Sequence, residues 1–297
     1  MAAVLPAELR QAVESALATF ARDGLGGVPP LVAEPIRYSI EGGGKRLRGM
    51  LLLAAYRAAG GVRDASGLAA AVEIVHAYSL VHDDLPCMDD DDVRRGRPTT
   101  HRVYGVPAAT LAGAVMIPLA ARLAYDSAAA LVLPEATGCT IVKVLAEAAG
   151  GGGMIGGQLL DLEAEGEGSA HSRDDLDAIH SAKTGALIAA SLEIGGLAAG
   201  ASGERLGALT DYGTRVGLAF QIMDDVLDVT SSTDKLGKIA GRDAALGKST
   251  YPAMLGIDGA KERAERLVRE ACDGLRLNSL LTPELEDLAG FVVSRTH

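Results

Sequence analysis

The sequence is poor in aromatic residues and in cysteine. Only 3% of its 297 residues are aromatic, and tryptophan is absent. The core must therefore be built from Ala, Leu, Val and Ile, within an apolar content of 48%. Such a composition favours close-packed helices over a sandwich of short strands. The three cysteines are scattered and odd in number, so they indicate neither a disulfide framework nor a zinc site.

Positive charge is also scarce, since the formal net charge is −11. An acidic chain is poorly suited to bind nucleic acid or anionic lipid, so neither is an expected partner. The first residues carry charges early and lack the apolar centre of a signal peptide. We therefore expect a cytoplasmic protein.

An uncharged stretch over residues 103–121 reaches the length of a membrane span. It is mostly Ala, which is weakly apolar, and it contains Gly105, Pro107, Gly113 and Pro118. A buried core helix is therefore favoured over a membrane span, and no span is expected.

Strand-like alternation is nearly absent from the chain, whereas helical periodicity recurs along it. A long apolar segment, 66–84, begins with Ser66 as a candidate N-cap. Further helices are expected over residues 7–20, 46–59, 107–130, 134–149, 153–162, 174–199, 203–229, 251–275 and 283–294. No shift in composition and no repeat of fixed period divides the chain. We therefore predict a single all-α domain over residues 1–297.

Six aspartates follow the apolar segment within ten residues. They are Asp83, Asp84, Asp89, Asp90, Asp91 and Asp92. Carboxylates this close raise each other's pKa unless cations intervene, and they suit Mg²⁺, which commonly shares its shell with substrate phosphates. The alternative, a solvated acidic loop, would not require aspartates to end an apolar helix. Asp83 and Asp89 do not align on a regular helix, so we expect a break at Pro86 to turn Asp89 back toward Asp83.

A second acidic segment contains Asp224 and Asp228, which lie one helical turn apart on the same face. The residues around them are strongly apolar, so the helix is expected to be buried over most of its circumference. An ordinary exposed acidic face is the alternative. Two like charges on a buried helix require a metal or a distant basic group, and we predict that both aspartates bind metal.

Basic residues accompany the acidic segments. Lys45, Arg46 and Arg48 follow three consecutive glycines, and Arg side chains with exposed backbone N–H groups suit phosphate oxygens. Other candidate phosphate contacts are Arg94, Arg95, Lys183, Lys238 and Lys248. His76 lies seven residues before Asp83, about 20° away on an ideal helix, so it is either a ligand of this site or an ordinary core histidine.

These segments together resemble the bacterial short-chain trans-polyprenyl-diphosphate synthases, and the farnesyl diphosphate synthases among them in particular. The matching stretches are GGGKRLR at 42–48, AVEIVHAYSLVHDDLPCMDDDDVRRGRPTTH at 71–101, GGQLLDLEAEG at 156–166, KTGAL at 183–187, FQIMDDVLD at 220–228 and LGKSTYPAMLG at 246–256. They cover nearly the whole chain in one order.

The resemblance implies an isoprenoid-synthase-type helical bundle around a deep central cavity, usually as a homodimer. It implies three Mg²⁺ ions per active site, bridging the allylic diphosphate and held by Asp83, Asp84, Asp89 and Asp224. The allylic diphosphate would also contact Arg94, Lys183 and Lys248, and isopentenyl diphosphate would contact Lys45, Arg48, His76 and Arg95. Lys183, Thr184 and Gln221 would lie beside the reacting carbons, and Lys238 would help to close the site.

The implied reaction begins with ionisation of the allylic C–O bond, continues with condensation and ends with loss of a proton. Tyr78 and Ser79 precede Asp83 by roughly 6–7.5 Å along a helix, the depth at which a growing chain would meet the cavity floor. Resemblance to relatives that make farnesyl diphosphate assigns Tyr78 to that floor, so farnesyl diphosphate is the expected product. Geranylgeranyl diphosphate synthase, a non-catalytic subunit of a heteromeric synthase and a terpene cyclase are the alternatives.

Two positions depart from the family pattern. Gly49 stands where Pro is usual, and Ala114 stands where Asp is usual, four residues before Pro118. We expect the first change to matter little. The second is expected to alter helix packing beside the cavity, and so to affect product size or stability.

Overall fold

The computed structural model describes residues 5–164, 172–230 and 250–295. Its first helical elements are α1 (Ala7–Thr19), a π-helical turn η1 (Phe20–Gly24), α2 (Pro30–Ile40), α3 (Leu47–Ala58), α4 (Ser66–Asp83), α5 (Thr100–Tyr104), α6 (Val106–Ala130) and α7 (Glu135–Ala149). The later ones are α8 (Met154–Glu163), α9 (Arg173–His180), a second π-helical turn η2 (Ser181–Gly185), α10 (Ala186–Ala198), α11 (Gly203–Thr230), α14 (Tyr251–Leu277) and α15 (Pro283–Ser294).

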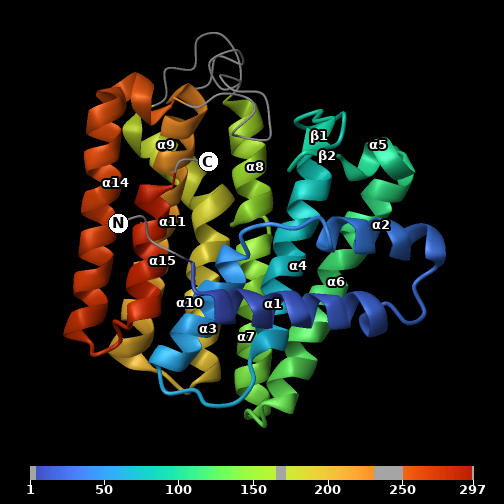
Figure 1. Ribbon diagram of the computed structural model, residues 1–297, viewed down its shortest axis with the longest axis horizontal. Helices are drawn as coiled ribbons and strands as arrows, with labels where there is room; N and C mark the ends of the chain where they lie inside the picture. Colours follow the sequence, from blue (N-terminus) through green and yellow to red (C-terminus); the bar gives the residue numbers. More distant parts are fainter. Residues whose placement is uncertain (1–4, 165–171, 231–249, 296–297) are drawn as a thin grey trace.

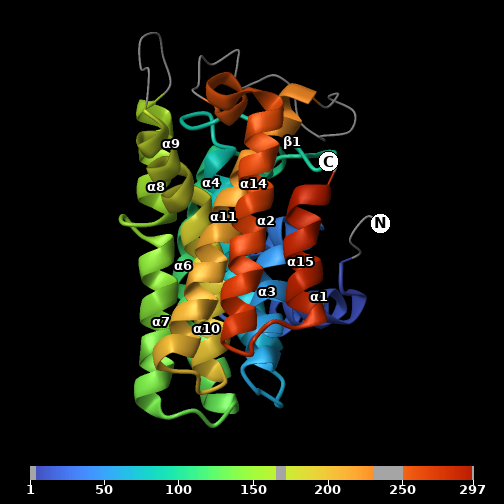
Figure 2. The same ribbon diagram turned by 90° about the vertical axis from the view of Figure 1, so that its left-hand side faces the viewer.

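The prediction of an all-α protein is confirmed. Within the described residues the only strands are β1 (Val93–Arg94) and β2 (Arg97–Pro98), which pair antiparallel in a small hairpin just after the first aspartate segment. The long helices run side by side, while α1 lies across them (Figures 1 and 2). The C-terminal ends of α4 and α11 carry the two aspartate segments.

Small residues allow the central helices to approach one another closely. The most buried elements are α3, α4 and α10, and most of their side chains are removed from solvent. At Gly195 of α10 an added Cβ would lie 2.4 Å from the carbonyl oxygen of Leu52 in α3. The small Ala and Gly side chains therefore let the helices pack closely, so the core is filled without large aromatic side chains.

Three expectations about helix boundaries are corrected. Helix α2 was not predicted, because Pro29, Pro30 and Pro35 obscure its periodicity; Pro30 in fact occupies the first turn, where its missing N–H costs nothing. Ser66 is the first residue of α4 and not its N-cap, and its N–H donates to the Asp64 carboxylate at 2.9 Å. The continuous helix expected over 174–199 is divided by η2.

Helix α6 is a core helix on one face only. Ala112, Gly113 and Met116 are buried, but Leu111 is 55% exposed and Tyr125 is 43% exposed. By length and composition alone α6 could cross a membrane, and a third of its most apolar window is buried in the fold. The expectation of a buried helix is therefore wrong for the opposite face, which carries Ala114 and Pro118.

Candidate active site

The first aspartate segment folds back on itself. Helix α4 ends at Asp83, before Pro86, and the backbone N–H of Asp89 donates to the carbonyl oxygen of Asp83 at 2.8 Å. The helix is therefore not straight through residues 83–90, and the expected return of Asp89 toward Asp83 is confirmed.

This arrangement leaves carboxylates in a poorly hydrated position. Burial raises the pKa of Asp83 to about 6; nearby Asp89 adds to this effect, while Lys183 opposes it. A divalent cation would reverse the shift. No preformed cage of three acidic, histidine or cysteine side chains occurs among the described residues. Mg²⁺ typically takes one or two carboxylates plus waters and phosphates, so Asp83 and Asp89 still fit such an ion.

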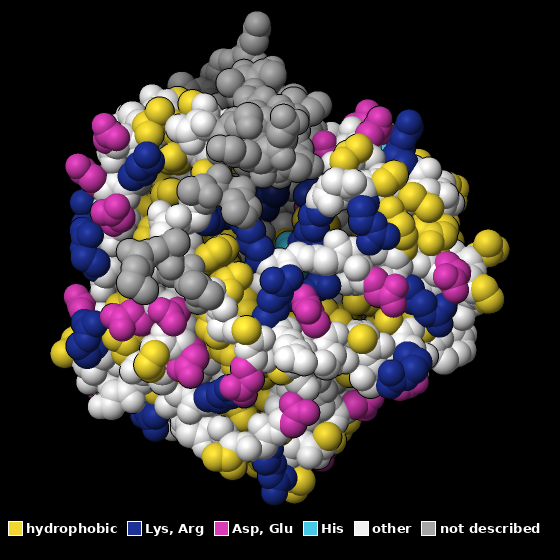
Figure 3. All heavy atoms as spheres, viewed as in Figure 1, with side chains coloured by type: hydrophobic (Ala, Val, Ile, Leu, Met, Phe, Trp, Pro, Cys, Tyr) yellow, Lys and Arg dark blue, Asp and Glu magenta, His cyan; other side chains and the backbone are white. Residues whose placement is uncertain are grey.

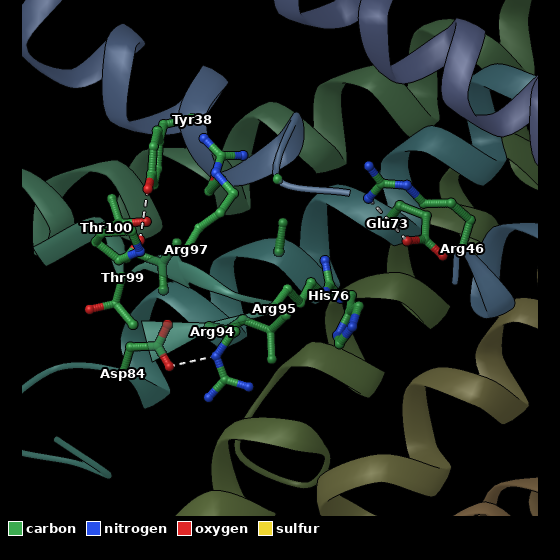
Figure 4. Close-up of a pocket in the computed structure, with 16 residues that line it drawn as sticks. Tyr38, Arg46, Glu73, His76, Asp84, Arg94, Arg95, Arg97, Thr99 and Thr100 are labelled. Atoms are coloured by element: carbon green, nitrogen blue, oxygen red, sulfur yellow. Dashed lines mark hydrogen bonds and ion pairs between the residues drawn. The ribbon is translucent and has the colours of Figure 1, made fainter. Parts of the chain in front are cut away.

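Asp84 forms an ion pair with an arginine of the hairpin. Its carboxylate accepts a 2.6 Å hydrogen bond from Arg94 Nε, and Asp91 lies 3.2 Å from the same guanidinium. Figure 4 shows Asp84 and Arg94 joined in this way, beside Arg95 and His76. In this structure, therefore, the predicted metal ligand Asp84 and the predicted diphosphate contact Arg94 are bound to each other.

The second aspartate segment lies on α11. Asp224 is partly exposed and forms a 2.8 Å ion pair with Arg295, whereas Asp228 is buried. Arg295 also stacks on the ring of Phe220, with its guanidinium carbon 3.8 Å from the ring centroid. Arg295 is not predictable from the motifs, because it lies outside all of them and reaches Asp224 only when α15 packs beside α11.

The π-helical turn η2 presents Lys183 and Thr184. Lys183 Nζ lies 2.6 Å from Asp161 Oδ2 of α8, and the Thr184 hydroxyl donates to Gln221 Oε1 at 2.9 Å. Close approach of α8 to η2 depends on Gly157, where an added Cβ would lie 2.2 Å from the backbone nitrogen of Lys183. The structure thus brings together the three residues expected beside the reacting carbons.

Two further residues of α8 join this group but were not singled out from the sequence. They are Asp161, paired with Lys183, and Gln158, whose Nε2 lies 3.4 Å from Asp89 Oδ1. Both belong to the GGQLLDLEAEG stretch, three residues apart on one helix face. This spacing, next to Gly156 and Gly157, is the sequence feature that could have indicated Gln158 and Asp161 as site residues.

The predicted isopentenyl diphosphate contacts form a cluster of like charges. Burial and Arg295 lower the pKa of Lys45, and burial lowers the pKa of Arg48, whose Nε has no hydrogen-bond partner among the described residues. Desolvation, together with Arg48 and Arg95, lowers the pKa of His76 well below its usual value. Such a concentration of positive charge suits an anion with several oxygens.

Part of this cluster lines an opening on the surface. Figure 3 shows Lys and Arg side chains around a hollow at the centre of this face, with a histidine at its depth. His76, Arg94 and Arg95 line a pocket between α2, α4 and the hairpin. Arg95 is oriented by donating to the carbonyl oxygen of Gly43.

Arg46 and Gly49 support this cluster without belonging to it. Arg46 Nη1 lies 3.9 Å from Glu73 Oε2, and Glu73 Oε1 accepts the backbone N–H of Gly49 at 2.9 Å. The Pro that is usual at position 49 has no N–H to donate. The departure at Gly49 therefore adds a hydrogen bond to a buried carboxylate.

Tyr78 and Ser79 take different directions on α4. Tyr78 is buried, its hydroxyl donates to the carbonyl oxygen of Ala149 at 3.1 Å, and its ring meets His82 edge to face. Ser79 donates to the carbonyl oxygen of His76 at 2.9 Å. Tyr78 is therefore held between α4 and the end of α7. The remaining predicted residues, Lys238 and Lys248, lie outside the described residues.

Comparison with known proteins identifies the family of the chain. The family model described as Polyprenyl synthetase matches residues 29–276. Farnesyl diphosphate synthase of Escherichia coli (strain K12) is 45% identical over 272 residues, 89% of each chain. The chloroplastic geranylgeranyl pyrophosphate synthase of Capsicum annuum is 41% identical over 269 residues, 90% of this chain and 72% of that protein.

Solved structures show the same likeness. The geranyltransferase of Helicobacter pylori, complexed with magnesium and isoprenyl diphosphate, superposes with a TM-score of 0.80 at 30% identity, over 96% of this chain and 95% of that chain. With the family model covering most of the chain, these matches assign both the fold and the class of reaction. The chain belongs to the polyprenyl synthetase family and is a prenyltransferase.

Proposed function

We propose that this protein condenses isopentenyl diphosphate with dimethylallyl and geranyl diphosphates, head to tail, to form farnesyl diphosphate, with Mg²⁺ as its cofactor. The observation that carries the proposal is the meeting of two groups of opposite charge. Asp83 lies within electrostatic reach of Asp89 and Lys183, and Asp224 lies within reach of Lys45 and Arg48. Carboxylates alone would repel a diphosphate, and cations alone would not hold a metal.

In the proposed reaction the allylic C–O bond breaks and its electron pair leaves with the diphosphate. Bound Mg²⁺, held by Asp83, Asp89 and Asp224, supplies positive charge that stabilises the leaving diphosphate. Lys183 adds a cation on the same side, within the electrostatic reach of Asp83. Three ions per site are proposed, because the charge of three divalent ions would balance the three carboxylates together with the three negative charges of an ionised allylic diphosphate.

The second substrate is held by the basic cluster. Lys45, Arg48, His76 and Arg95 bind the diphosphate of isopentenyl diphosphate, which places its double bond to attack the allylic carbocation. The proton lost from the adduct is taken up by the departed diphosphate, so no protein nucleophile is required. Buried apolar residues of α4 and α10 exclude water that would otherwise quench the cation.

The choice of product rests on Tyr78. Relatives that make farnesyl and geranylgeranyl diphosphates have similar identity to this chain, so overall similarity does not separate the two products. The buried Tyr78 side chain, tied to Ala149, supports a shallow cavity floor and hence the shorter chain.

A direct assay tests the function. The protein is incubated with isopentenyl and dimethylallyl diphosphates, with Mg²⁺ or with EDTA, and the dephosphorylated products are sized by chromatography. Farnesol from the Mg²⁺ reaction alone supports the proposal, and geranylgeraniol would contradict the product assignment. Absence of any product would favour the alternative of a non-catalytic subunit.

We also propose a homodimer formed through the exposed face of α6. Leu111, Ile117 and Tyr125 are exposed on a helix with no charged residue before Arg122. A face this apolar is typical of a subunit interface. Its occupant would be α6 of a second copy, since isologous pairing covers the same patch on both subunits.

A further inference from the structure

Asp225 lies between Asp224 and the buried Val226 of α11, but its side chain does not join the metal-binding group. Its Oδ2 accepts the backbone N–H of Tyr251 at 3.1 Å and lies 3.4 Å from His180 Nε2. Its Oδ1 lies 3.4 Å from Gln221 Nε2. Asp224 instead faces Arg295. The two adjacent aspartates therefore contact different residues.

Asp225 belongs to a polar network that joins three helices. The ring of His180, from α9, stacks on the ring of Tyr251, from α14, with centroids 5.6 Å apart. The Tyr251 hydroxyl donates to Asp177 of α9, which also accepts from Arg263 of α14. Asp225 is 3% exposed and Tyr251 is fully buried. A buried carboxylate is tolerated here because both of its oxygens have polar neighbours.

The network continues from Asp225 into the active site. Gln221 Nε2 faces Asp225, and Gln221 Oε1 accepts from the Thr184 hydroxyl. Both oxygens of Asp225 act as acceptors, Oδ2 from the backbone N–H of Tyr251 and Oδ1 from Gln221 Nε2, so the amide nitrogen of Gln221 lies on the Asp225 side. The amide oxygen must then face Thr184, and the single hydroxyl hydrogen of Thr184 is committed to it.

We propose that Asp225 is a positioning residue and not a metal ligand. It fixes the orientation of the Gln221 amide, and through it the direction of the Thr184 hydroxyl hydrogen. With its hydrogen directed to Gln221, Thr184 presents only oxygen lone pairs to its other neighbours. Lone pairs stabilise an adjacent carbocation, whereas an O–H hydrogen would oppose it. This inference rests on the proposed placement of Thr184 and Gln221 beside the reacting carbons.

Two aspartate variants separate the roles. Asp225→Asn keeps the shape of the side chain but introduces an N–H₂ donor that allows the Gln221 amide to reverse. We expect kcat to fall at least tenfold, with the KM values for both substrates and the half-saturating Mg²⁺ concentration changed less than threefold. The matched control Asp224→Asn should raise the half-saturating Mg²⁺ concentration at least tenfold. An Asp225→Asn variant that behaves like the control would overturn the inference.

A second substitution tests the polarity directly. In the double variant Asp225→Asn/Gln221→Glu, the new amide can donate to one oxygen of the new carboxylate, and its other oxygen can accept from Thr184. The Thr184 hydroxyl would again donate its hydrogen to residue 221, so kcat should be higher than in either single variant. In a Thr184→Val background, where no hydroxyl remains to be oriented, Asp225→Asn should have less than a threefold effect on kcat. If Asp225→Asn still lowered kcat tenfold in the Thr184→Val variant, the role of Asp225 would be purely structural and the inference would be contradicted.

A binding measurement keeps this test separate from the proposed function. Mg²⁺ is titrated calorimetrically into each protein in the presence of inorganic diphosphate, with thermal unfolding as the control for folding. Asp224→Asn should weaken Mg²⁺ binding and Asp225→Asn should not. If the wild-type protein formed no prenyl product, the proposed function alone would fail. Weakened Mg²⁺ binding in Asp225→Asn would still refute the inference, and unchanged binding would support it.

Discussion

Among single side chains, Tyr78 shows how one residue can serve both stability and specificity. Its burial raises the pKa of the hydroxyl to about 12, so the group remains a hydrogen-bond donor to Ala149 at every physiological pH. The same side chain lies five residues before Asp83, on the helix that carries the first aspartate segment. Ring volume and hydrogen bond can therefore be tested separately.

Replacing Tyr78 by Ala should lengthen the product from farnesyl to geranylgeranyl diphosphate or beyond, because it removes the ring from the cavity floor. Tyr78→Phe keeps the ring, so the product should stay unchanged while the free energy of unfolding falls by about 1–3 kcal/mol for the unpaired Ala149 carbonyl. Product chromatography and urea unfolding are the measurements. Unchanged product length in Tyr78→Ala would refute the role of Tyr78 as the floor.

His76 is neutral at pH 7, because desolvation and the surrounding arginines lower its pKa well below 6.5. Binding to a diphosphate then requires a hydrogen-bond donor and no charge, so His76→Gln should keep the KM for isopentenyl diphosphate within about threefold at pH 7.5. His76→Leu should raise it about tenfold or more, since a hydrogen bond to a charged group is worth about 1.5–3 kcal/mol. Equal losses in both variants would show that the imidazole charge matters.

The same residue predicts a pH dependence of stability. Below about pH 6.5 the unfolded chain takes up a proton on His76 and the folded protein does not, so this contribution to stability is present above that pH and is lost as the pH falls. The difference in free energy of unfolding between the wild type and His76→Gln should therefore change between about pH 7 and 5. A constant difference over this range would contradict the lowered pKa.

At the scale of elements, α6 is an unusual helix, because Pro118 lies well inside it. Proline has no N–H for the carbonyl of Ala114, one turn before, and it crowds that turn. The position is exposed in the single chain, so packing within one subunit does not require the ring.

Pro118→Ala should therefore raise the free energy of unfolding by about 1–3 kcal/mol, because it restores the missing helical hydrogen bond. Pro107→Ala is the matched control. Pro107 lies in the first turn of α6, where its N–H would have no partner within the helix, so little change is expected there. Denaturant unfolding of both variants measures the effect, and equal changes would argue against it.

At the scale of the whole molecule, we propose that the exposed face of α6 decides the oligomeric state. If a second copy covers it, Leu111→Asp should shift the protein from dimer to monomer in analytical ultracentrifugation, because a buried unpaired carboxylate is costly. Leu277→Asp is the control, since Leu277 is 86% exposed at the distant end of α14. A wild-type monomer, or a dimer unaffected by Leu111→Asp, would contradict the proposed interface.

Local chemistry alone determined much of this protein. Helical periodicity predicted nearly all of the described helices, because amphipathic spacing and capping act over a few residues. The exceptions were α2, hidden by its prolines, the short helix α5, and the π-helical turns η1 and η2. Clusters of aspartate and arginine also indicated metal and phosphate chemistry without any tertiary information.

Only the tertiary structure decided which of these residues meet. Asp83 and Asp84 are neighbours in sequence, yet one faces the Lys183 side and the other binds Arg94. Arg295 meets Asp224, and Asp225 is directed to His180 and Tyr251, only after distant helices have packed. Spacing along one helix gives only the relative directions of its side chains, whereas the residues that each side chain meets depend on packing between elements. The kind of chemistry was therefore a property of the sequence, and the division of roles among its carboxylates was a property of the fold.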